Sequence, residues 1–232
     1  MIDAALLEKL KSYDTPTICN ALEIVDPARR LTGFTVKPLV CPFPTLPPIV
    51  GYARTVAIRS THAHELDPKK ARDQRIAYYE YVASKPAPGI MIIQDLDGHE
   101  VGFGAFWGEV MSAVHKGLGC LGVVTDGSIR DIDQWAPGFQ ALAGSIVPSH
   151  AHVHLADFGK EVRVAGMLVR SGDIVHADRH GAVTVPSAVA EKIPAACDLL
   201  ARKEAVILEM ARAPGFNVAR LREALAKQDE IH

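Results

Sequence analysis

The stretch from residue 89 to residue 131 constrains the fold most, because strand-like and helix-like segments alternate along it. IMIIQDL (90–96) is a short apolar run typical of a buried strand, and CLGVVT (120–125) is a second one. Between them lie a glycine-rich loop and a segment, 109–118, whose apolar residues recur at helical spacing. This order of strand, loop, helix and strand predicts an α/β fold.

The segments outside this stretch predict helices at both ends of the chain and a strand-rich layer in the second half. The expected helices are 3–12, 16–24, 68–84, 187–213 and 218–228, and the further expected strands are 51–60 and several short runs within 145–186. Thr15 is a candidate N-cap for the second helix, since Pro16 suits the first helical position. Pro194 would bend or restart the helix that contains it.

We expect one compact domain over residues 1–232, with its core at about 14–186 and C-terminal helices within 187–228. The segment 38–48 contains five prolines and excludes regular structure. Apolar residues interleave these prolines, which favours an ordered loop over a domain linker.

Composition excludes several classes of function. The chain has 25 Lys and Arg against 27 Asp and Glu, so its net charge of −2 gives no electrostatic support for nucleic-acid binding. No apolar run reaches the length of a membrane span, and the N-terminal segment is unlike a secretory signal. The four cysteines are far apart without a CxxC pair, which indicates free thiols. We therefore expect a cytoplasmic protein.

Chemistry-bearing residues gather within GAFWGEVMSAVHKGLGCLGVVTDGSIRD, residues 104–131. Gly108 allows a sharp turn before the helix, and Glu109 stands at the start of that helix. The first helical amides, at Val110 and Met111, have no intrahelical partner, so this end suits a carboxylate or phosphate. The apolar positions Val110, Ala113, Val114 and Leu118 predict the buried face of the helix.

The strand at 120–125 delivers Arg130 and Asp131 to the following loop, where ligands bind in open α/β sheets. The Arg130 guanidinium can hold a substrate carboxylate or a developing oxyanion. The Asp131 carboxylate can hold a hard cation such as Mg²⁺, with waters completing the shell. A surface ion pair and a helix N-terminal acid are the alternative reading of Arg130, Asp131 and Glu109.

The segment resembles the RraA-like family, which includes metal-dependent 4-hydroxy-4-methyl-2-oxoglutarate aldolases and the regulator of ribonuclease activity A. Members of the aldolase branch share an acidic residue, twenty intervening residues and Arg-Asp, which correspond here to Glu109, Arg130 and Asp131. The segments DTPTICNAL (14–22) and SGDIVHADRHGAVTVP (171–186) also resemble the family. The resemblance implies a swivelling β/β/α fold, assembled as a homotrimer or hexamer with active sites between subunits.

The resemblance also implies roles for individual residues. Asp131 would bind Mg²⁺ or Mn²⁺, with Glu204 of a neighbouring subunit in support. Arg130 would contact the carbonyl and carboxylate of a pyruvate-like group, and the Val110 and Met111 amides would hold that carboxylate. Glu109 would order water at the metal.

Histidines at alternate positions form a second group. His150, His152 and His154 would lie on one face of a strand, and His62 and His64 form another alternating pair. We predict that His150 and His152 bind the far end of the substrate. A zinc or iron site is the alternative, because imidazole suits both metals.

The motif residues and the resemblance together imply a divalent-metal-dependent lyase, an aldolase or an oxaloacetate-type decarboxylase, that acts on a small 2-oxo acid through a pyruvate enolate. The alternatives are a non-catalytic RraA-like regulator that binds a partner protein, and a hydratase or isomerase of a sugar acid on the same site. A Schiff-base aldolase would need a desolvated lysine, and Lys37 beside Pro38 is a poor candidate.

Overall fold

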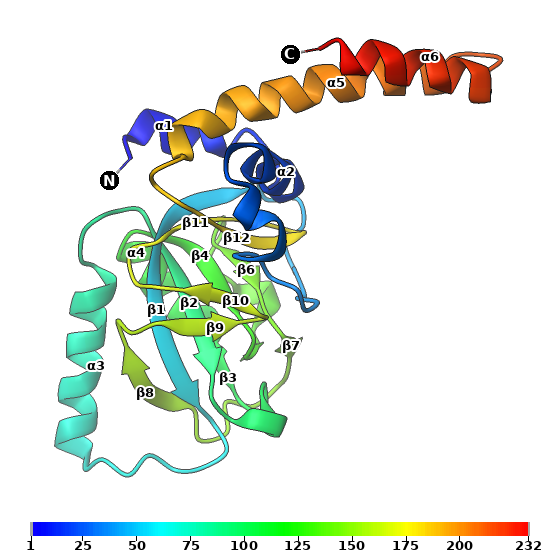
Figure 1. Ribbon diagram of the computed structural model, residues 1–232. Helices are drawn as coiled ribbons and strands as arrows, with labels where there is room; N and C mark the ends of the chain where they lie inside the picture. Colours follow the sequence, from blue (N-terminus) through cyan, green and yellow to red (C-terminus); the bar gives the residue numbers. More distant parts are fainter. Residues whose placement is uncertain (1, 232) are drawn as a thin grey trace.

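The computed structural model describes residues 2–231, and its central feature is a seven-stranded mixed sheet (Figure 1). All residues of β1 (Ile49–Arg59) except Arg59 are buried. β1 pairs in parallel with β2 (Gly89–Asp95), β2 with β4 (Cys120–Thr125), and β4 with β6 (Gln140–Leu142). The expected strands at 51–60, 90–96 and 120–125 are therefore confirmed.

Antiparallel strands complete the other side of β1. The hairpin of β11 (Ile174–Asp178) and β12 (Gly181–Val185) pairs with the first half of β1, and β8 (His154–Phe158) pairs with its second half. A separate two-stranded sheet is made of β9 (Val162–Val164) and β10 (Met167–Val169). The strand-rich layer expected within 145–186 is confirmed, and the sheet is mixed where a βαβ pattern alone indicates parallel pairing.

A small parallel sheet of very short strands was not predicted. It consists of β3 (Ala105–Trp107), β5 (Ser128–Ile129) and β7 (Ser145–Ile146). The sequence patterns indicate loops at the first two positions. Two or three residues are too few to show a period, so only tertiary pairing defines these strands.

The N-terminal helices α1 (Ala4–Leu10) and α2 (Thr15–Val25) pack against the β11–β12 hairpin. The prediction of Thr15 as N-cap is wrong, because Thr15 is the first helical residue. The cap is Asp14, whose side chain accepts a hydrogen bond from the Thr17 amide at 2.9 Å. Both residue types cap helices well, and the carboxylate of Asp14 is the one in register with the third amide.

The helix α3 (Pro68–Val82) stands at the edge of the molecule and buries only Tyr78 and Val82 (Figure 1). Its C-terminal end is anchored by Arg54, a buried cation on β1. The Arg54 guanidinium donates hydrogen bonds to the carbonyl oxygens of Val82, Ser84 and Pro86. A cation at this position complements the negative end of the helix dipole.

The helix α4 (Glu109–Gly117) exposes Val110 and Ala113, which its apolar spacing predicts to be buried, whereas the other two predicted positions, Val114 and Leu118, are partly buried. Val110 is 70% exposed, while Ser112 and His115 are fully buried. Met111 and Leu118 complete the face that packs on the core. The polar pair is tolerated inside because the Ser112 hydroxyl accepts from the Ala136 amide and His115 bonds Tyr78.

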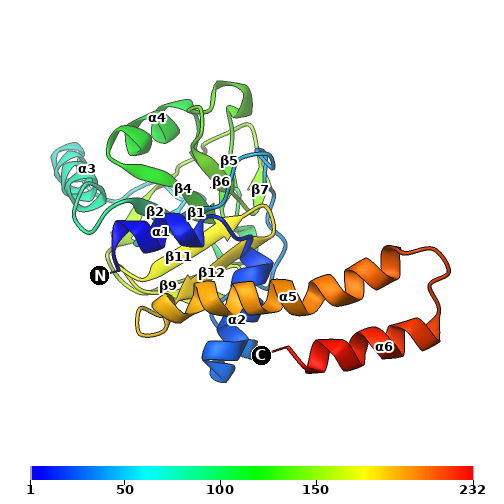
Figure 2. The same cartoon turned by 90° about the horizontal axis from the view of Figure 1, so that it is seen from above.

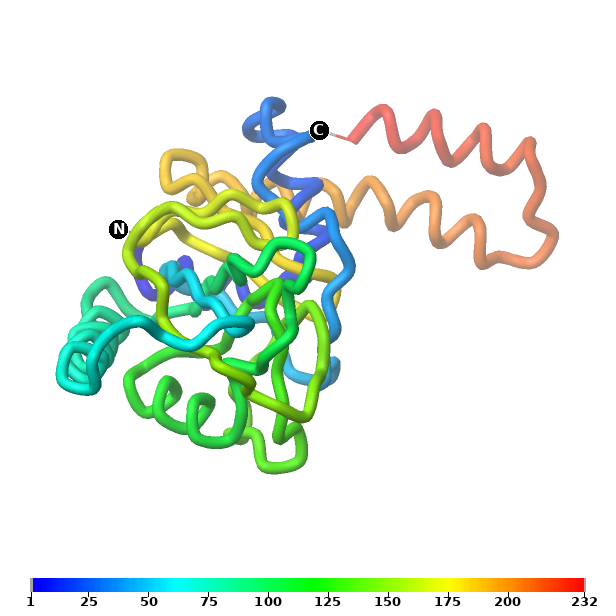
Figure 3. Tube along the Cα trace, turned by 90° about the horizontal axis from the view of Figure 1, so that it is seen from below, coloured from blue at the N-terminus to red at the C-terminus, as the bar shows by residue number. Residues whose placement is uncertain are grey.

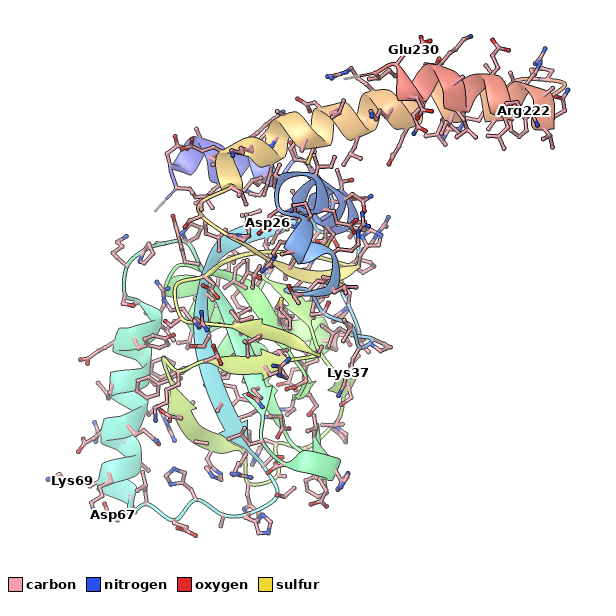
Figure 4. The ribbon with its side chains drawn as sticks, in the orientation of Figure 1. Asp26, Lys37, Asp67, Lys69, Arg222 and Glu230 are labelled. Carbon is pink, nitrogen blue, oxygen red and sulfur yellow. The ribbon has the colours of Figure 1, made fainter. Side chains whose placement is uncertain are left out.

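The C-terminal helices form a hairpin that projects from the body (Figures 1 and 3). α5 (Ile193–Arg212) buries only Ile193, Ala196 and Cys197 and then continues outward, and α6 (Val218–Asp229) returns beside it. Pro194 lies in the first turn of α5, so it restarts the helix after the short 3₁₀ turn Ala190–Lys192. Figure 4 labels Arg222 on α6 and Glu230 at its end, and both lie far from the sheet.

The remaining features are the proline-rich segment, the cysteines and the short helices. The segment 38–48 contains no helix or strand element, and its Phe43, Leu39 and Cys41 pack against the core. All four cysteines are free thiols. None of the helices described over residues 2–231 is both long and apolar enough to cross a membrane. Three further 3₁₀ helices are Pro27–Leu31, Gly98–Glu100 and Ile132–Gln134.

Candidate active site at the start of α4

The small sheet brings the two halves of the Glu-x20-Arg-Asp motif together. β3 and β5 are parallel neighbours, with Trp107 opposite Ile129. The Arg130 amide donates a hydrogen bond to the Trp107 carbonyl at 2.9 Å. Because the chain must run through α4 and β4 between these strands, the twenty-residue interval is the length of one crossover between neighbouring parallel strands.

Asp131 turns back toward the start of α4. Its backbone is left-handed, with φ 54° and ψ 43°, which a non-glycine residue rarely adopts. Its Oδ2 lies 3.4 Å from the Glu109 amide nitrogen and 3.5 Å from the Arg130 Nε. The Arg130 and Asp131 side chains are 35% and 39% exposed, so the pair faces solvent and remains available to a ligand.

Gly108 makes this approach possible. A Cβ atom at position 108 would lie 2.4 Å from Asp131 Oδ2 and 3.3 Å from the Arg130 Cγ. Real Cβ atoms do not come so close to an oxygen, so a larger residue would displace the carboxylate. The glycine that the sequence suggests for a sharp turn is also required by the close approach of Asp131.

The amide end of α4 lies at the same place. Ser112 is the first residue of the helix whose amide bonds a carbonyl of its own turn, that of Gly108 at 3.0 Å. The Val110 and Met111 amides precede it and have no acceptor within the helix. Together with Arg130, they form a positive surface beside the Asp131 carboxylate, as expected for binding of an anionic substrate.

The side chains at this place suit some metal ions and not others. Among residues 2–231, no three His, Cys, Asp or Glu side chains are placed to hold an ion together. An all-protein zinc site, including one of histidines, is therefore not formed within one chain. The exposed Asp131 carboxylate with Glu109 nearby fits a hard divalent cation, because Mg²⁺ keeps several waters and needs only one or two carboxylates.

Glu204 does not lie at this site within the chain. It is an exposed residue of α5, and Figures 2 and 3 show α4 and α5 separated by the strands of the main sheet. Glu204 could meet Asp131 only across two copies of the chain, as the resemblance implies.

The expected histidine strand is wrong. His150 and His152 belong to a turn in which Ala151 has a φ of 48°, and β8 begins only at His154. The backbone turns because the Ser149 carbonyl bonds the Ala105 amide at 2.9 Å and the His152 amide bonds the Ser60 carbonyl at 3.0 Å. The three histidines nevertheless line one pocket of about 500 Å³, together with Val110 and Met111.

Two carboxylates near the motif were missed, Asp95, which is buried, and Asp126, which is half-buried. Asp95 ends β2 and Asp126 follows β4, and the Asp95 amide donates to Asp126 Oδ1 at 2.8 Å. Burial raises the pKa of Asp126 to about 6, and the neighbouring charge of Asp95 adds to the effect. Burial also raises the pKa of Asp95. The sequence itself offers a signal for this pair, because each aspartate stands at the end of an apolar strand, where ligands bind in α/β sheets.

His115 was missed because only the apolar positions of α4 were expected to be buried. Its Nδ1 donates to the Met111 carbonyl at 2.7 Å, so the neutral ring accepts a hydrogen bond from the Tyr78 hydroxyl at Nε2, 2.5 Å away. Burial lowers the pKa of His115 to about 4. This contact joins α4 to α3 directly beneath the pocket.

Comparison with known proteins agrees with these features. The RraA-like family, described as Aldolase/RraA, matches residues 15–184. A protein of Halalkalibacterium halodurans named "Putative 4-hydroxy-4-methyl-2-oxoglutarate aldolase" is 29% identical over 180 residues, covering 77% of this chain and 76% of its own. A protein of Marinomonas sp. with the same name is 33% identical over 107 residues, covering 45% of this chain and 64% of its own.

A solved structure shows the same fold. RraAS2 of Streptomyces coelicolor, described as an unusual member of the RNase ES inhibitor RraA protein family, superposes with a TM-score of 0.66 at 22% identity. The match covers 91% of this chain and 97% of RraAS2. The mixed α/β architecture, the extent of the family match and the convergence of Glu109, Arg130 and Asp131 lead to one conclusion: this chain belongs to the RraA-like family.

Proposed function

We propose that the protein is a divalent-metal-dependent carbon–carbon lyase, an aldolase or an oxaloacetate-type decarboxylase, acting on a small 2-oxo acid. The supporting observation is the convergence of the Arg130 guanidinium, the Asp131 carboxylate and the free amide end of α4 at one exposed place. Both reactions break a bond beside a carbonyl and leave a pyruvate enolate. Such a site supplies positive charge where the enolate develops negative charge.

Each residue has a role in this proposal. The amides of Val110 and Met111 bind the substrate carboxylate, and Arg130 holds the carbonyl oxygen and stabilises its charge as the bond breaks. Glu109, exposed at the first position of α4, orders water there. A cation such as Mg²⁺ or Mn²⁺ held by Asp131 would supply Lewis-acid stabilisation of the same oxygen.

We further propose that the site is completed in a homo-oligomer, a trimer or a hexamer. The α5–α6 hairpin projects from the body (Figure 2), and the buried residues of α5, which are Ile193, Ala196 and Cys197, all lie in its first two turns. A long helix that leaves its own domain suits contact with a neighbouring copy. Glu204 lies on this projecting part and would reach Asp131 of the neighbour.

A Schiff-base mechanism finds no support in the structure. Lys37, which directly precedes the segment 38–48, is exposed at the surface and is labelled in Figure 4. A lysine needs a desolvated position to be a nucleophile at neutral pH, and Lys37 lacks one.

The test is release of pyruvate from oxaloacetate and from 4-hydroxy-4-methyl-2-oxoglutarate, measured after exhaustive chelation and after adding Mg²⁺ or Mn²⁺. We expect activity to disappear with chelation and to return with the metal. Full activity in the chelated protein would contradict the metal requirement. No turnover of any 2-oxo acid under any condition would favour the regulator that binds a partner protein, and turnover without pyruvate would favour a hydratase or isomerase.

A further inference from the structure

The pocket of about 500 Å³ between α3 and the histidine turn adjoins the reacting centre and extends beyond it. Val110 and Met111 line the pocket, so it begins at the first turn of α4. The rings of Tyr79 and Phe106 form part of the pocket wall, and the Tyr79 hydroxyl contacts the Met111 sulfur at 3.7 Å. A three-carbon pyruvate unit would leave most of this volume empty, since pockets of this size hold much larger ligands.

The pocket carries groups that bind anions and none that repel them. No Asp or Glu is among the residues that line it, whereas Arg75 of α3 does line it. Within residues 2–231, Arg75 has neither a hydrogen-bond nor an ion-pair partner. An unpaired guanidinium at an apolar wall is well suited to a carboxylate or a phosphate.

The hydrogen bonds of the imidazoles decide what each ring presents when neutral. The Leu66 amide donates to His64 Nδ1 at 3.1 Å, so the neutral ring carries its proton on Nε2 and can donate. His150 Nδ1 donates to the Ala151 carbonyl at 2.7 Å, and His154 Nδ1 donates to the His152 carbonyl at 2.8 Å. Their Nε2 atoms are therefore acceptors in the neutral rings.

His64 is held beside the other histidines. Its ring lies 4.6 Å from that of His154, edge to face. The pocket thus combines two donors, Arg75 and His64, with acceptors from the histidine turn and an aromatic wall. A ligand that fits these groups has an apolar segment that ends in an anionic group.

We propose that this pocket binds the distal end of the substrate, and that this end is an apolar or aromatic segment terminating in a carboxylate or phosphate bound by Arg75 and His64. The inference rests on the proposed function for the reacting end of the substrate. It makes Arg75 and His64 residues that determine specificity, while Arg130 and Asp131 remain at the reacting centre.

Binding of small probes tests the pocket independently of catalysis. Isothermal titration would compare phenylacetate with its neutral isostere phenylacetamide, on the wild type, Arg75→Gln and His64→Leu. We expect the wild type to prefer the anion about tenfold, as for one charge-assisted hydrogen bond, and Arg75→Gln to lose that preference. The matched control is Arg72→Gln, which changes an exposed arginine three residues before Arg75 on α3 that does not line the pocket.

Three results of this titration would overturn the proposal. Equal affinity for anion and amide in the wild type, or an unchanged preference in Arg75→Gln, would overturn the proposal. An equal loss in Arg72→Gln would also overturn it, since the effect would then be the general charge of α3. Phenyl phosphate, run in parallel, identifies the terminal group: tighter binding than phenylacetate indicates a phosphate, and weaker binding a carboxylate.

Kinetics distinguish failure of the pocket from failure of the lyase. With 4-hydroxy-2-oxo acids that carry a 4-carboxyphenyl or a 4-carbamoylphenyl group, Arg75→Gln should lower kcat/KM for the acid about tenfold and leave the amide unchanged. Oxaloacetate decarboxylation should be unaffected, because oxaloacetate has no distal segment. If no 2-oxo acid is cleaved but the titration shows the Arg75-dependent preference, the lyase proposal fails and the anion subsite stands.

Discussion

Asp131 Oδ2 lies 3.4 Å from the amide nitrogen of Glu109, so the last residue of the motif points back at its first. The carboxylate thereby complements the positive end of α4, which has no side-chain cap because its N-cap is Gly108. The same carboxylate is exposed to solvent and is the group proposed to hold the cation. A ligand at this place would therefore be held by the same residues that fix the start of the helix.

Arg130 gives the first prediction. Replacement by Lys keeps the charge but loses the planar fork, so Arg130→Lys should lower kcat by about 100-fold or more, with the fold retained. Pyruvate-release kinetics at saturating substrate measure kcat, and circular dichroism checks the fold. A variant with wild-type turnover would show that Arg130 does not contact the reacting atoms.

Gly108 gives the second prediction. In Gly108→Ala the new Cβ would meet Asp131 Oδ2 at 2.4 Å, so the carboxylate must move. We expect kcat/KM to fall at least about tenfold, since small displacements at a reacting centre are costly. Gly117→Ala is the matched control on the same helix, because a Cβ at position 117 meets nothing within 4 Å. Equal losses in the two variants would contradict the steric explanation.

His115 gives a prediction about stability and pH. Its folded pKa of about 4 lies below its ordinary value of 6.5, so the unfolded chain binds the proton first as pH falls. The free energy of unfolding should therefore decrease by about 3 kcal/mol from this group alone as pH falls from 6.5 toward 4. His115→Gln should lose this dependence, as measured by urea unfolding at each pH. An unchanged pH slope would show that His115 is not a buried neutral ring.

Asp126 should act in the opposite direction within the same pH range. Its folded pKa of about 6 lies above its ordinary value of 3.8, so its contribution to stability is present at low pH and is lost as pH rises toward 6. Asp126→Asn keeps a carbonyl oxygen that can accept from the Asp95 amide and removes the charge. Relative to the wild type, the variant should gain stability with rising pH, measured by thermal unfolding between pH 4 and pH 7. A variant that loses stability equally at every pH would contradict the assignment.

Glu204 tests whether sites are shared between subunits. Glu204→Gln should lower activity without changing the mass measured by light scattering. Glu209, an exposed residue further along α5, provides the control, and Glu209→Gln should change neither the activity nor the mass. Co-expression of the inactive Arg130→Lys and Glu204→Gln chains should restore part of the activity, because some mixed interfaces contain only unaltered residues. Absence of any recovery in confirmed mixed oligomers, or an active monomer, would remove Glu204 from the site.

Sequence periodicity predicted the long elements well and the short ones poorly. The strands β1, β2 and β4 and the helix α3 were all anticipated within a few residues, because their length lets burial impose a clear period. The strands β3 and β5 have three and two residues, and no local pattern distinguishes them from loops. Yet these two strands are what place Glu109 beside Arg130.

The sequence by itself determined the class of fold, the free amide end of α4 and the residues of the Glu-x20-Arg-Asp motif, because each depends on local spacing and residue type. Only the tertiary structure decided which face of α4 is buried, since hydrogen-bond partners on distant segments satisfy Ser112 and His115 there. It also decided that His150 and His152 lie on a turn and that they line a pocket together with Arg75. Contacts between residues far apart in the chain carry no local period, so no pattern along the sequence could reveal them.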